Sequence, residues 1–299
     1  MWFRNLHVFR LTADWPEDIV QFQQALASRA FRGCASNALQ TAGWVPPRGH
    51  EGEWLISVQG QWLICLGVEQ RLLPTSVVRQ YAQERLTELE EQQGFRPGRR
   101  QVQEIREAVT AELLPRAFIR RRLTYVWIDP KGGWLVIDAG SAARADEVIE
   151  HLKITLGTLP LRPLQTQQSP TTAMTAWLAS GEAPAGFSID RDCELRDSTE
   201  ERATVRYTRH NLDGQEVNQH IAEGKAATRL ALTWDDRISF VLTEQMQIKR
   251  LAFLDILKEQ SEQQAENSDE LFEADLAIMA GELSHLLPQL VAALGDEAE

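Results

Sequence analysis

The stretch from residue 74 to residue 122 constrains the fold of this chain more than any other. Residues 74–93 and 101–114 each carry apolar side chains at helical spacing. Glycines and a proline at 94–98 interrupt that spacing, and neither residue type continues a helix well. The pattern predicts two helices joined by a tight turn, a helical hairpin that can project from the rest of the protein as an arm.

The second half of this stretch is strongly basic. Residues 95–122 contain eight arginines and three glutamates, a local charge of +5 in a chain whose formal net charge is −12. The window contains the phrase LLPRAF (113–118), in which Pro115 stops the second helix and Phe118 lies among arginines. Two interpretations stay open for the window: a surface for an anion, or a solvated helix face with one buried phenylalanine.

Most of the negative charge lies near the C-terminus. Residues 259–299 contain eleven acidic and no basic residues, which leaves a net charge of −1 for residues 1–258. The body of the protein is therefore near neutral, and its positive charge is free to cluster. Arginine supplies 26 of the 31 basic residues, and its guanidinium pairs with phosphates and carboxylates through two hydrogen bonds.

The sequence shows no sign of export or membrane insertion. Its start lacks the apolar core of a signal peptide, and no run of about 18 apolar residues is present. The three cysteines, Cys34, Cys65 and Cys193, are far apart and form no CxxC pair. We therefore expect a reduced, cytoplasmic protein with neither a disulfide framework nor a structural zinc.

Outside the arm, many short segments alternate apolar and polar residues, which is the period of a half-buried strand. Gly60-Gln61 and Asp235-Asp236 are turn sequences that join two pairs of such segments into hairpins. A rigid loop at 43–47 and a linker at 160–163 are expected, because each contains two prolines. We expect strands at 2–11, 54–58, 62–66, 123–128, 134–137, 187–195, 203–207, 227–234 and 238–242. Residues 248–251 are either a further strand or the lead-in to a helix.

Helix signals lie between these strands. Asp14 with Glu17, and Asp213 with Glu216, have the spacing of a capping box, and Ser141 is a further candidate cap. The last expected helix is long and amphipathic, and a proline near its end can kink it. We expect helices from residue 14 to near 33 and at 141–156, 174–178, 213–224 and 270–294.

The order of these elements indicates the fold class. Strands and helices interleave without a strict βαβ order, which favours an α+β fold with antiparallel sheets over a doubly wound parallel sheet. Breaks in composition predict four parts: an N-terminal α+β part at 1–72, the helical arm at 73–117, an αβ part at 118–163, and a C-terminal α+β part at 164–299 that ends in the acidic helix.

Nucleotide hydrolysis finds little support in the sequence. Gly224-Lys225 resembles the end of a P-loop, but residue 219 is Gln and residue 226 is Ala, where that motif needs Gly and Ser or Thr. The six histidines show no metal-ligand spacing. We expect no cofactor.

Four aspartates are candidate Mg²⁺ ligands for a nuclease: Asp129, Asp138, Asp235 and Asp236. Three of them flank tight turns, where aspartate is common because its side chain bonds the backbone. The structural interpretation is therefore favoured. A Mg²⁺-dependent nuclease that uses Asp129 and Asp138 stays as the enzymatic alternative.

A second basic cluster lies in the C-terminal part. Arginine and lysine at helix ends often only satisfy backbone carbonyls, so this cluster permits both a structural and an anion-binding role. The sequence has no RNP motif, zinc finger or clear helix-turn-helix, so non-specific phosphate contact is simpler than sequence readout. The cluster comprises Arg202, Arg206, Arg209, His210, Lys225 and Arg229.

Several unusual phrases occur together, and they resemble the bacterial recombination-associated protein family RdgC. The similarity runs from the first residue to nearly the last. The phrases are MWFRNL (1–6), GWVPP (43–47), LLPRAF (113–118), WID (127–129), HIAEGK (220–225), LALxW (230–234) and GEL (281–283).

The resemblance implies a toroidal homodimer. Two curved, multi-lobed subunits would meet at two interfaces and enclose a positively lined hole wide enough for duplex DNA. It further implies binding of double- and single-stranded DNA without sequence preference, no enzymatic activity, association with the nucleoid, and restraint of the strand-exchange recombinase through occupation of DNA. An acidic protein can work in this way if its basic groups line the hole and its acids face outward.

The resemblance also implies roles for residues of the LLPRAF phrase and the strand that follows. Arg116 would face DNA, and Phe118 would pack at the interface that opens and closes the ring. Arg120 and Arg122 are further candidates for DNA binding. An alternating strand cannot point all three arginines of 120–122 at one hole.

In the C-terminal part, the resemblance places Arg209 and His210 near the second contact, where a Lys-Gln type of pair is common in the family. Lys225 would be another cation of the inner surface. An unperturbed histidine is mostly neutral at pH 7, which leaves the charge at position 210 open. A third alternative, besides the ring and the nuclease, is a protein-interaction scaffold whose acidic C-terminal helix binds a basic partner.

Overall fold

The computed structural model of the chain describes residues 1–299 except 14, 17, 50–51, 198–202, 264 and 299. Within these residues, twelve strands form one sheet in which every strand pair is antiparallel. The strands are β1 (Leu6–Leu11), β2 (Gln40–Val45), β3 (Ile56–Val58), β4 (Gln61–Leu72), β5 (Phe118–Asp129), β6 (Trp134–Asp138), β7 (Leu161–Pro163), β8 (Phe187–Asp197), β9 (Thr204–Tyr207), β10 (Lys225–Trp234), β11 (Ile238–Thr243) and β12 (Ile248–Phe253).

The order of strands across the sheet is β2-β4-β5-β6-β1-β12-β11-β10-β8-β9, with β3 beside β4 and β7 beside β1. The helices are α1 (Ile19–Ser28), α2 (Thr75–Gln93), α3 (Arg99–Leu113), the 3-10 helix η1 (Leu114–Arg116), α4 (Ala142–Leu156), α5 (Pro170–Ser180), α6 (Gln215–Ala222), α7 (Asp255–Gln263) and α8 (Ser268–Ala293). The predicted α+β class and the antiparallel sheet are confirmed.

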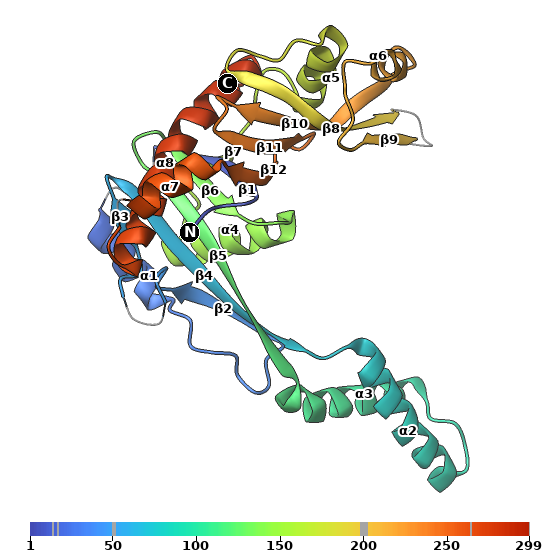
Figure 1. Cartoon of the computed structure of the whole chain (residues 1–299). Helices are drawn as coiled ribbons and strands as arrows, with labels where there is room; N and C mark the ends of the chain where they lie inside the picture. The colour runs from blue at the N-terminus through green and yellow to red at the C-terminus, as the bar shows by residue number, and fades with distance from the viewer. Residues whose placement is uncertain (14, 17, 50–51, 198–202, 264, 299) are drawn as a thin grey trace.

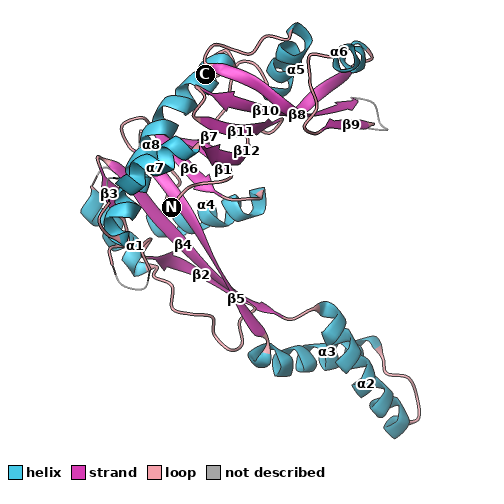
Figure 2. Cartoon of the chain, viewed as in Figure 1, coloured by secondary structure: helices cyan, strands magenta, loops and turns pink. Residues whose placement is uncertain are grey.

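The subunit curves into a crescent (Figure 1). The hairpin of α2 and α3 forms the projecting arm at one end, as its sequence predicts, and β9 with α6 forms the other end. Helix α8 runs along the outer side of the curve, whereas α4 lies on the inner side. Figure 2 shows the strands as one continuous layer between these helices.

The N-terminal half of the sheet is covered on both faces. Inward residues of β4, β5 and β6 pack with α1 and α4 in one core that includes Phe22, Ile64, Val126 and Val148. The alternate residues of the same strands, such as Trp127, belong to a second core shared with α8. The alternation of side chains along each strand is what divides these apolar residues between two cores.

The C-terminal half of the sheet is joined to the first half through β1 and β12. Leu6 lies opposite Ile248, and the backbone N–H of Leu251 donates to the carbonyl of Arg4 at 2.8 Å. Helices α5, α6 and α8 share one core with the inward residues of β8, β10, β11 and β12. The N-terminal strand thus holds the two halves of the crescent together.

Helix α8 is long and apolar enough to cross a membrane by length and composition alone, with a mean hydropathy of 1.3 in its most apolar window. The expectation that no such segment exists needs this correction. The buried side of the helix packs in the core rather than facing outward, and it contains Ala274, Asp275, Leu276, Met279, Ala280, Leu283, Leu286, Leu287, Leu290 and Val291.

Two segments predicted as a loop and a linker pair with the sheet instead. Residues 43–45 form the end of β2, and only the two prolines that follow lie outside it. A proline favours an extended conformation in the residue before it, so the proline pair is compatible with the strand. Residues 161–163 form β7, which pairs with the end of β1. Its one proline, Pro163, is tolerated because β7 is short and pairs with no second strand among the described residues.

The caps of two helices also differ from prediction. The proposed cap at Asp14 and Glu17 lies outside the described residues, and α1 begins after Asp18, whose carboxylate accepts from the N–H groups of Val20 and Gln21. Helix α6 is capped by Gly214, one residue after the predicted Asp213, and no side chain bonds its free N–H groups. Spacing alone therefore located these helices but not their first residues.

Candidate nucleic-acid interface

One face of the C-terminal half of the sheet has no helix over it among the residues that the structure describes. The side chains on this face point to the same side of the sheet as α4. Two contacts establish this orientation. The Lys249 ammonium of β12 donates to the carbonyl of Gly140, just before α4, at 3.2 Å, and Arg122 of β5 forms an ion pair with Glu147 of α4. We call this surface the α4-side face; it lines the inner curve of the crescent (Figure 1).

Strands β4 and β5 run on toward the arm as a ribbon, and β2 accompanies β4 only as far as Gln70 (Figure 1). Alternation places Phe118, Arg120 and Arg122 on the α4-side face of the ribbon, as the sequence suggested. Arg121 lies on the opposite face, where its guanidinium contacts the ring of Phe31. The strand period thus separates the arginines of 120–122 into two sets.

Phe118 is 85% exposed, which excludes the interpretation of this residue as an ordinary core phenylalanine. It lies at the outer end of the ribbon, opposite Leu72, which is also exposed. An exposed aromatic beside an exposed leucine is typical of a surface that another molecule covers. Both residues therefore lie outside the core, and a role for Phe118 at an interface stays a prediction.

The two arginines that follow Phe118 on this face are already engaged. Arg120 donates to the side-chain oxygen of Gln70 at 2.9 Å, which leaves its charge unneutralised. Arg122 is largely buried and is paired with Glu147. Arg120 therefore has charge to offer a phosphate, whereas the charge of Arg122 is compensated within the subunit.

Arg116 ends the 3-10 helix η1 and is exposed. Its guanidinium makes no hydrogen bond or ion pair with the described residues. It acts only at longer range on Glu112, whose pKa is lowered mainly by Arg85 and to a lesser degree by Arg116. Arg116 is thus a free cation beside the exposed Phe118.

Sequence reasoning missed Arg71, a buried arginine that holds this turn in place. Its side chain is 9% exposed and its guanidinium donates to backbone carbonyls on both sides of it, at 3.2 to 3.5 Å. Strand alternation is the sequence signal that could have identified Arg71 as buried, because it places Arg71 on the same strand face as the buried Leu63 and Cys65. The carbonyls belong to Leu114, Pro115 and Ala117 of the turn and to Cys34 and Ala35 of the neighbouring loop.

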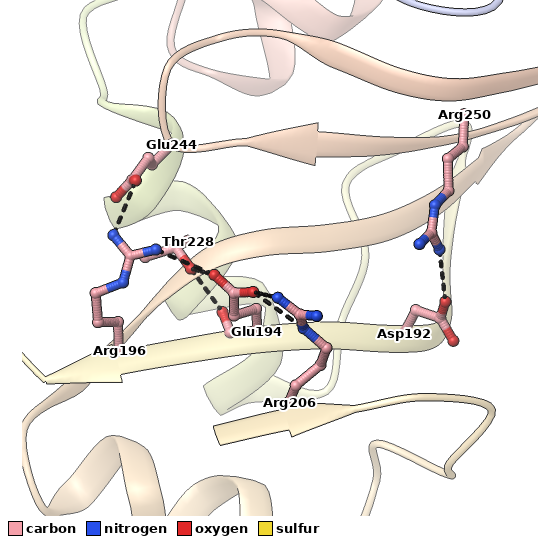
Figure 3. A network of polar contacts seen from close by, with 7 residues as sticks. All are labelled: Asp192, Glu194, Arg196, Arg206, Thr228, Glu244 and Arg250. Atoms are coloured by element: carbon pink, nitrogen blue, oxygen red, sulfur yellow. Dashed lines mark hydrogen bonds and ion pairs between the residues drawn. The ribbon is translucent and has the colours of Figure 1, made fainter. Parts of the chain in front are cut away.

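In the C-terminal half, a buried carboxylate organises the basic residues (Figure 3). Glu194 of β8 accepts hydrogen bonds from Arg206 of β9 and from Thr228 of β10. Burial alone would raise the pKa of Glu194, but these hydrogen bonds outweigh burial and hold it below its usual value. Arg196 joins the same network and also reaches Glu244. The charges of Arg206 and Arg196 are therefore used largely within the subunit.

Arg209 and His210 lie in an exposed turn after β9. The backbone of Arg209 is left-handed, with φ of 53°, and its N–H donates to the Asp192 carboxylate at 2.8 Å. His210 packs its ring 5.3 Å from that of Tyr207, between centroids. Both side chains are available at the end of the crescent opposite the arm, in keeping with the prediction of a second contact.

The structure does not bring Lys225 together with these residues. Lys225 is on the helix-covered face of β10, with a side chain only 13% exposed. It is paired with Glu223 at 3.0 Å and lies 3.3 Å from a ring nitrogen of His220. These contacts favour a structural role, and a contact with DNA at this residue stays a prediction. Arg202 of the same predicted cluster lies outside the described residues.

The two aspartates of the nuclease alternative cannot share one metal ion. Asp129 lies beside Trp134 at the start of β6, whereas Asp138 ends that strand, four residues on, which is roughly 13 Å at the rise of a strand. Asp129 accepts the N–H groups of Lys131 and Gly132, and Asp138 accepts those of the residues at 4–5. Among the described residues, no group of three or more His, Cys, Asp or Glu side chains is placed to hold a metal.

Comparisons with known proteins agree on one family. A family model described as "Putative exonuclease, RdgC" matches residues 1–297. A "Recombination-associated protein RdgC" of Dechloromonas aromatica (strain RCB) is 57% identical over 99% of this chain and 98% of its own length. Proteins of the same name from Janthinobacterium sp. (strain Marseille) and Herminiimonas arsenicoxydans are each 52% identical, over 100% and 99% of this chain and 99% of each relative.

Proposed function

Since this chain belongs to the RdgC family, we propose that it binds double- and single-stranded DNA without sequence preference, as a ring-shaped homodimer that encircles the DNA. In this proposal the protein is nucleoid-associated and non-enzymatic, and it limits strand exchange by the recombinase because it occupies the DNA. The observation that carries the proposal is the crescent itself. Its inner curve is lined by the α4-side face, which carries cations, and one end exposes Phe118.

The distribution of charge supports DNA on the inner curve. The acidic residues of 259–299 lie mainly on α7 and α8, along the outer side. The free or partly free cations Arg116, Arg120 and Arg229 lie on the inner side or at its rim. A protein of net charge −12 can therefore present a positive surface to phosphate, because the two signs are separated in space.

The exposed ends of the crescent support self-association. Phe118 and Leu72 form an apolar pair at one end, and a two-fold interface would bury each residue twice. A second copy is the occupant that also closes the curve into a ring, with the turn of Arg209 and His210 at the other end as the second contact. Aromatic residues near the centre of a protein–protein interface often contribute much of the binding energy.

The test combines solution mass with binding to linear and closed circular duplex DNA. We expect a dimer of about twice 33.8 kDa that retards both forms and stays longer on circular DNA. A monomer, or equal retention on both forms, would contradict the ring.

The description of the family as an exonuclease makes a second measurement necessary. Linear and plasmid DNA are incubated with the protein and Mg²⁺, and the products are separated. We expect retarded but intact DNA, because Asp129 and Asp138 are too far apart to share a metal. Nicked or shortened DNA would favour the nuclease. Absence of any DNA binding at about 50 mM salt, where phosphate contacts are strong, would favour the acidic scaffold.

A further inference from the structure

A small cavity on the α4-side face has more positive than negative groups around it. It lies between β8, β9, β10 and β12 and has a volume of about 80 Å³. Pockets for drug-sized ligands are roughly 300–1,000 Å³, so this one has room only for a small group. Its charged lining consists of Arg206, Arg229, Lys249 and Arg250 against Asp192 and Glu194.

The two acids are already engaged. Glu194 is held by Arg206, Arg196 and Thr228, and Asp192 lies 3.3 Å from the guanidinium of Arg250 while it also accepts the N–H of Arg209 (Figure 3). Four cations against two acids leave two positive charges in excess. Asp192 and Glu194 already pair with other groups, so neither acid neutralises this excess.

Arg229 and Lys249 supply this excess charge. The guanidinium of Arg229 makes no hydrogen bond or ion pair with any described residue, although it lies near enough to Glu194 to help lower the pKa of that carboxyl. The Lys249 ammonium has one partner, the carbonyl of Gly140. Burial, and then the charge of Arg229, lower the pKa of Lys249. Two cations thus line a common cavity, and neither forms an ion pair with a described residue.

We propose that this cavity is an oxyanion site that holds one phosphate group between Arg229 and Lys249. An incoming phosphate would accept hydrogen bonds from both cations and relieve their mutual repulsion. Arg250, whose side chain is 75% exposed and only loosely held by Asp192, completes the site from β12. This inference deepens the proposed function, on which it rests for the source of the phosphate: a backbone phosphate of DNA rather than free phosphate.

The backbone around the site supports a defined geometry. Arg250 has a left-handed backbone, with φ of 52°, at an irregularity in the pairing of β11 with β12. Asp192 binds both Arg250 and the equally left-handed Arg209. A phosphate that draws Arg250 away from Asp192 would therefore act on the same carboxylate that holds the turn of Arg209 and His210.

The first test uses inorganic phosphate as the probe and the full-length chain without DNA. The midpoint of thermal unfolding is followed against phosphate concentration, with chloride at the same ionic strength as the reference. A ligand that binds only the folded protein raises the midpoint in a saturable way. We expect such a shift in the parent and its loss in the double variant Arg229→Gln/Lys249→Met.

The matched control is Lys153→Met together with Arg144→Gln, which removes the same charges from exposed positions of α4 outside the cavity. This control should keep the phosphate-specific shift. An equal shift in all three proteins, or none in the parent, would overturn the site. The midpoints in chloride show whether the double variant is folded.

The second test uses a short DNA duplex and separates the two sources of phosphate. If the site takes a backbone phosphate, the double variant should lower the slope of log affinity against log salt by about 0.9 for each site removed, and the control should not match it. Inorganic phosphate should also weaken DNA binding more than chloride does at the same ionic strength. A phosphate-specific thermal shift in a protein that binds no DNA would leave the oxyanion site standing and would overturn both the DNA source and the proposed function. Normal DNA binding with no effect of the double variant in either test would overturn the site alone.

Discussion

The two basic regions of this protein have similar residue types but use their charges differently. At the end of the ribbon, Arg116 is exposed and unpaired beside an exposed phenylalanine, and the buried Arg71 holds only backbone carbonyls. On the C-terminal strands, Arg196 and Arg206 are tied to the buried Glu194, and most of the positive charge is compensated inside the subunit. The number of arginines in a segment therefore does not tell how much charge is available to a partner.

This difference suggests a division of roles. The ribbon end offers an apolar contact and a free cation, which suits assembly next to DNA. The C-terminal strands offer a polar network beside which Arg229 and Lys249 line a cavity, and neither of the two forms an ion pair with a described residue. Substitutions in each region test this division of roles.

We expect the largest effect from Phe118→Ser, which removes the exposed aromatic side chain of the proposed dimer interface. A buried aromatic at an interface often contributes about 2 kcal/mol or more, and a two-fold contact counts it twice. We expect a dimer dissociation constant raised about a thousandfold, and faster loss from closed circular DNA. Solution mass and retention on circular DNA are the measurements.

The control for Phe118 is Phe95→Ser, which removes another exposed phenylalanine, at the turn of the arm. It should leave assembly unchanged. If the Phe118→Ser protein has the same solution mass as the parent and stays on circular DNA for as long as the parent does, Phe118 does not hold the ring closed.

Arg71→Met tests whether the ribbon end is held rigidly. The substitution removes the Arg71 donor from five backbone carbonyls, of which those of Leu114 and Ala35 keep a backbone N–H partner, so we expect the free energy of unfolding to fall by about 2–3 kcal/mol. Denaturant unfolding measures this change, and amide exchange should increase at residues 114–118. Arg79→Met, at an exposed arginine of α2, is the control, and an equal loss in both variants would show that Arg71 has no special role.

The comparison between free and compensated arginines can be measured directly in DNA binding. Arg116→Ala should weaken binding to all sequences alike and lower the salt slope by about 0.9 for each phosphate that the variant no longer neutralises. Arg206→Ala should change that slope less, because Glu194 already neutralises Arg206. Equal slopes for the parent and Arg116→Ala, measured on two unrelated duplexes, would argue against an interaction of Arg116 with phosphate.

The smallest effect is expected in the acid range. The pKa of Glu194 is lowered in the folded protein, so its contribution to stability is fully present above the unfolded pKa of about 4.3 and is lost as the pH falls through the folded value. Glu194→Gln should therefore flatten the dependence of unfolding free energy on pH below about 4.3, by at most about 1.4 kcal/mol per pH unit. Glu112→Gln, at an exposed carboxylate paired with Arg85 on the arm, should flatten it less. Identical curves for the parent and Glu194→Gln would mean that the network does not stabilise the fold.

Local patterns in the sequence predicted most elements of the fold. The arm, the two hairpins and the long last helix follow from period, glycine and turn-forming residues, which act within a few residues. The first hairpin turn lies at 59–60, one residue before the predicted Gly60-Gln61. The misassigned segments are those where pairing with a distant strand decided the outcome. Residues 161–163 are a strand only because β1 lies beside them, and nothing near them in the chain signals that partner.

The candidate site divides in the same way. The sequence predicted Phe118 and the arginines beside it as candidate site residues, and strand alternation separates Arg121 from Arg120 and Arg122. It did not reveal the buried Arg71, or that Lys225 lies on the covered face of its strand. Those outcomes depend on the faces that helices cover, which are set by packing.

Composition and local period were enough to predict the helical arm and the separation of acidic from basic segments, because both depend on residues close together in the chain. The family came from whole phrases of sequence and from the comparison with relatives. The tertiary structure alone decided which cations are free. Arg206 is compensated because its guanidinium pairs with the Glu194 carboxylate of the neighbouring strand, whereas the Arg229 guanidinium forms no ion pair with a described residue. Availability of charge is a property of non-local contacts, and the residue type of an arginine does not encode the carboxylate that folding places beside it.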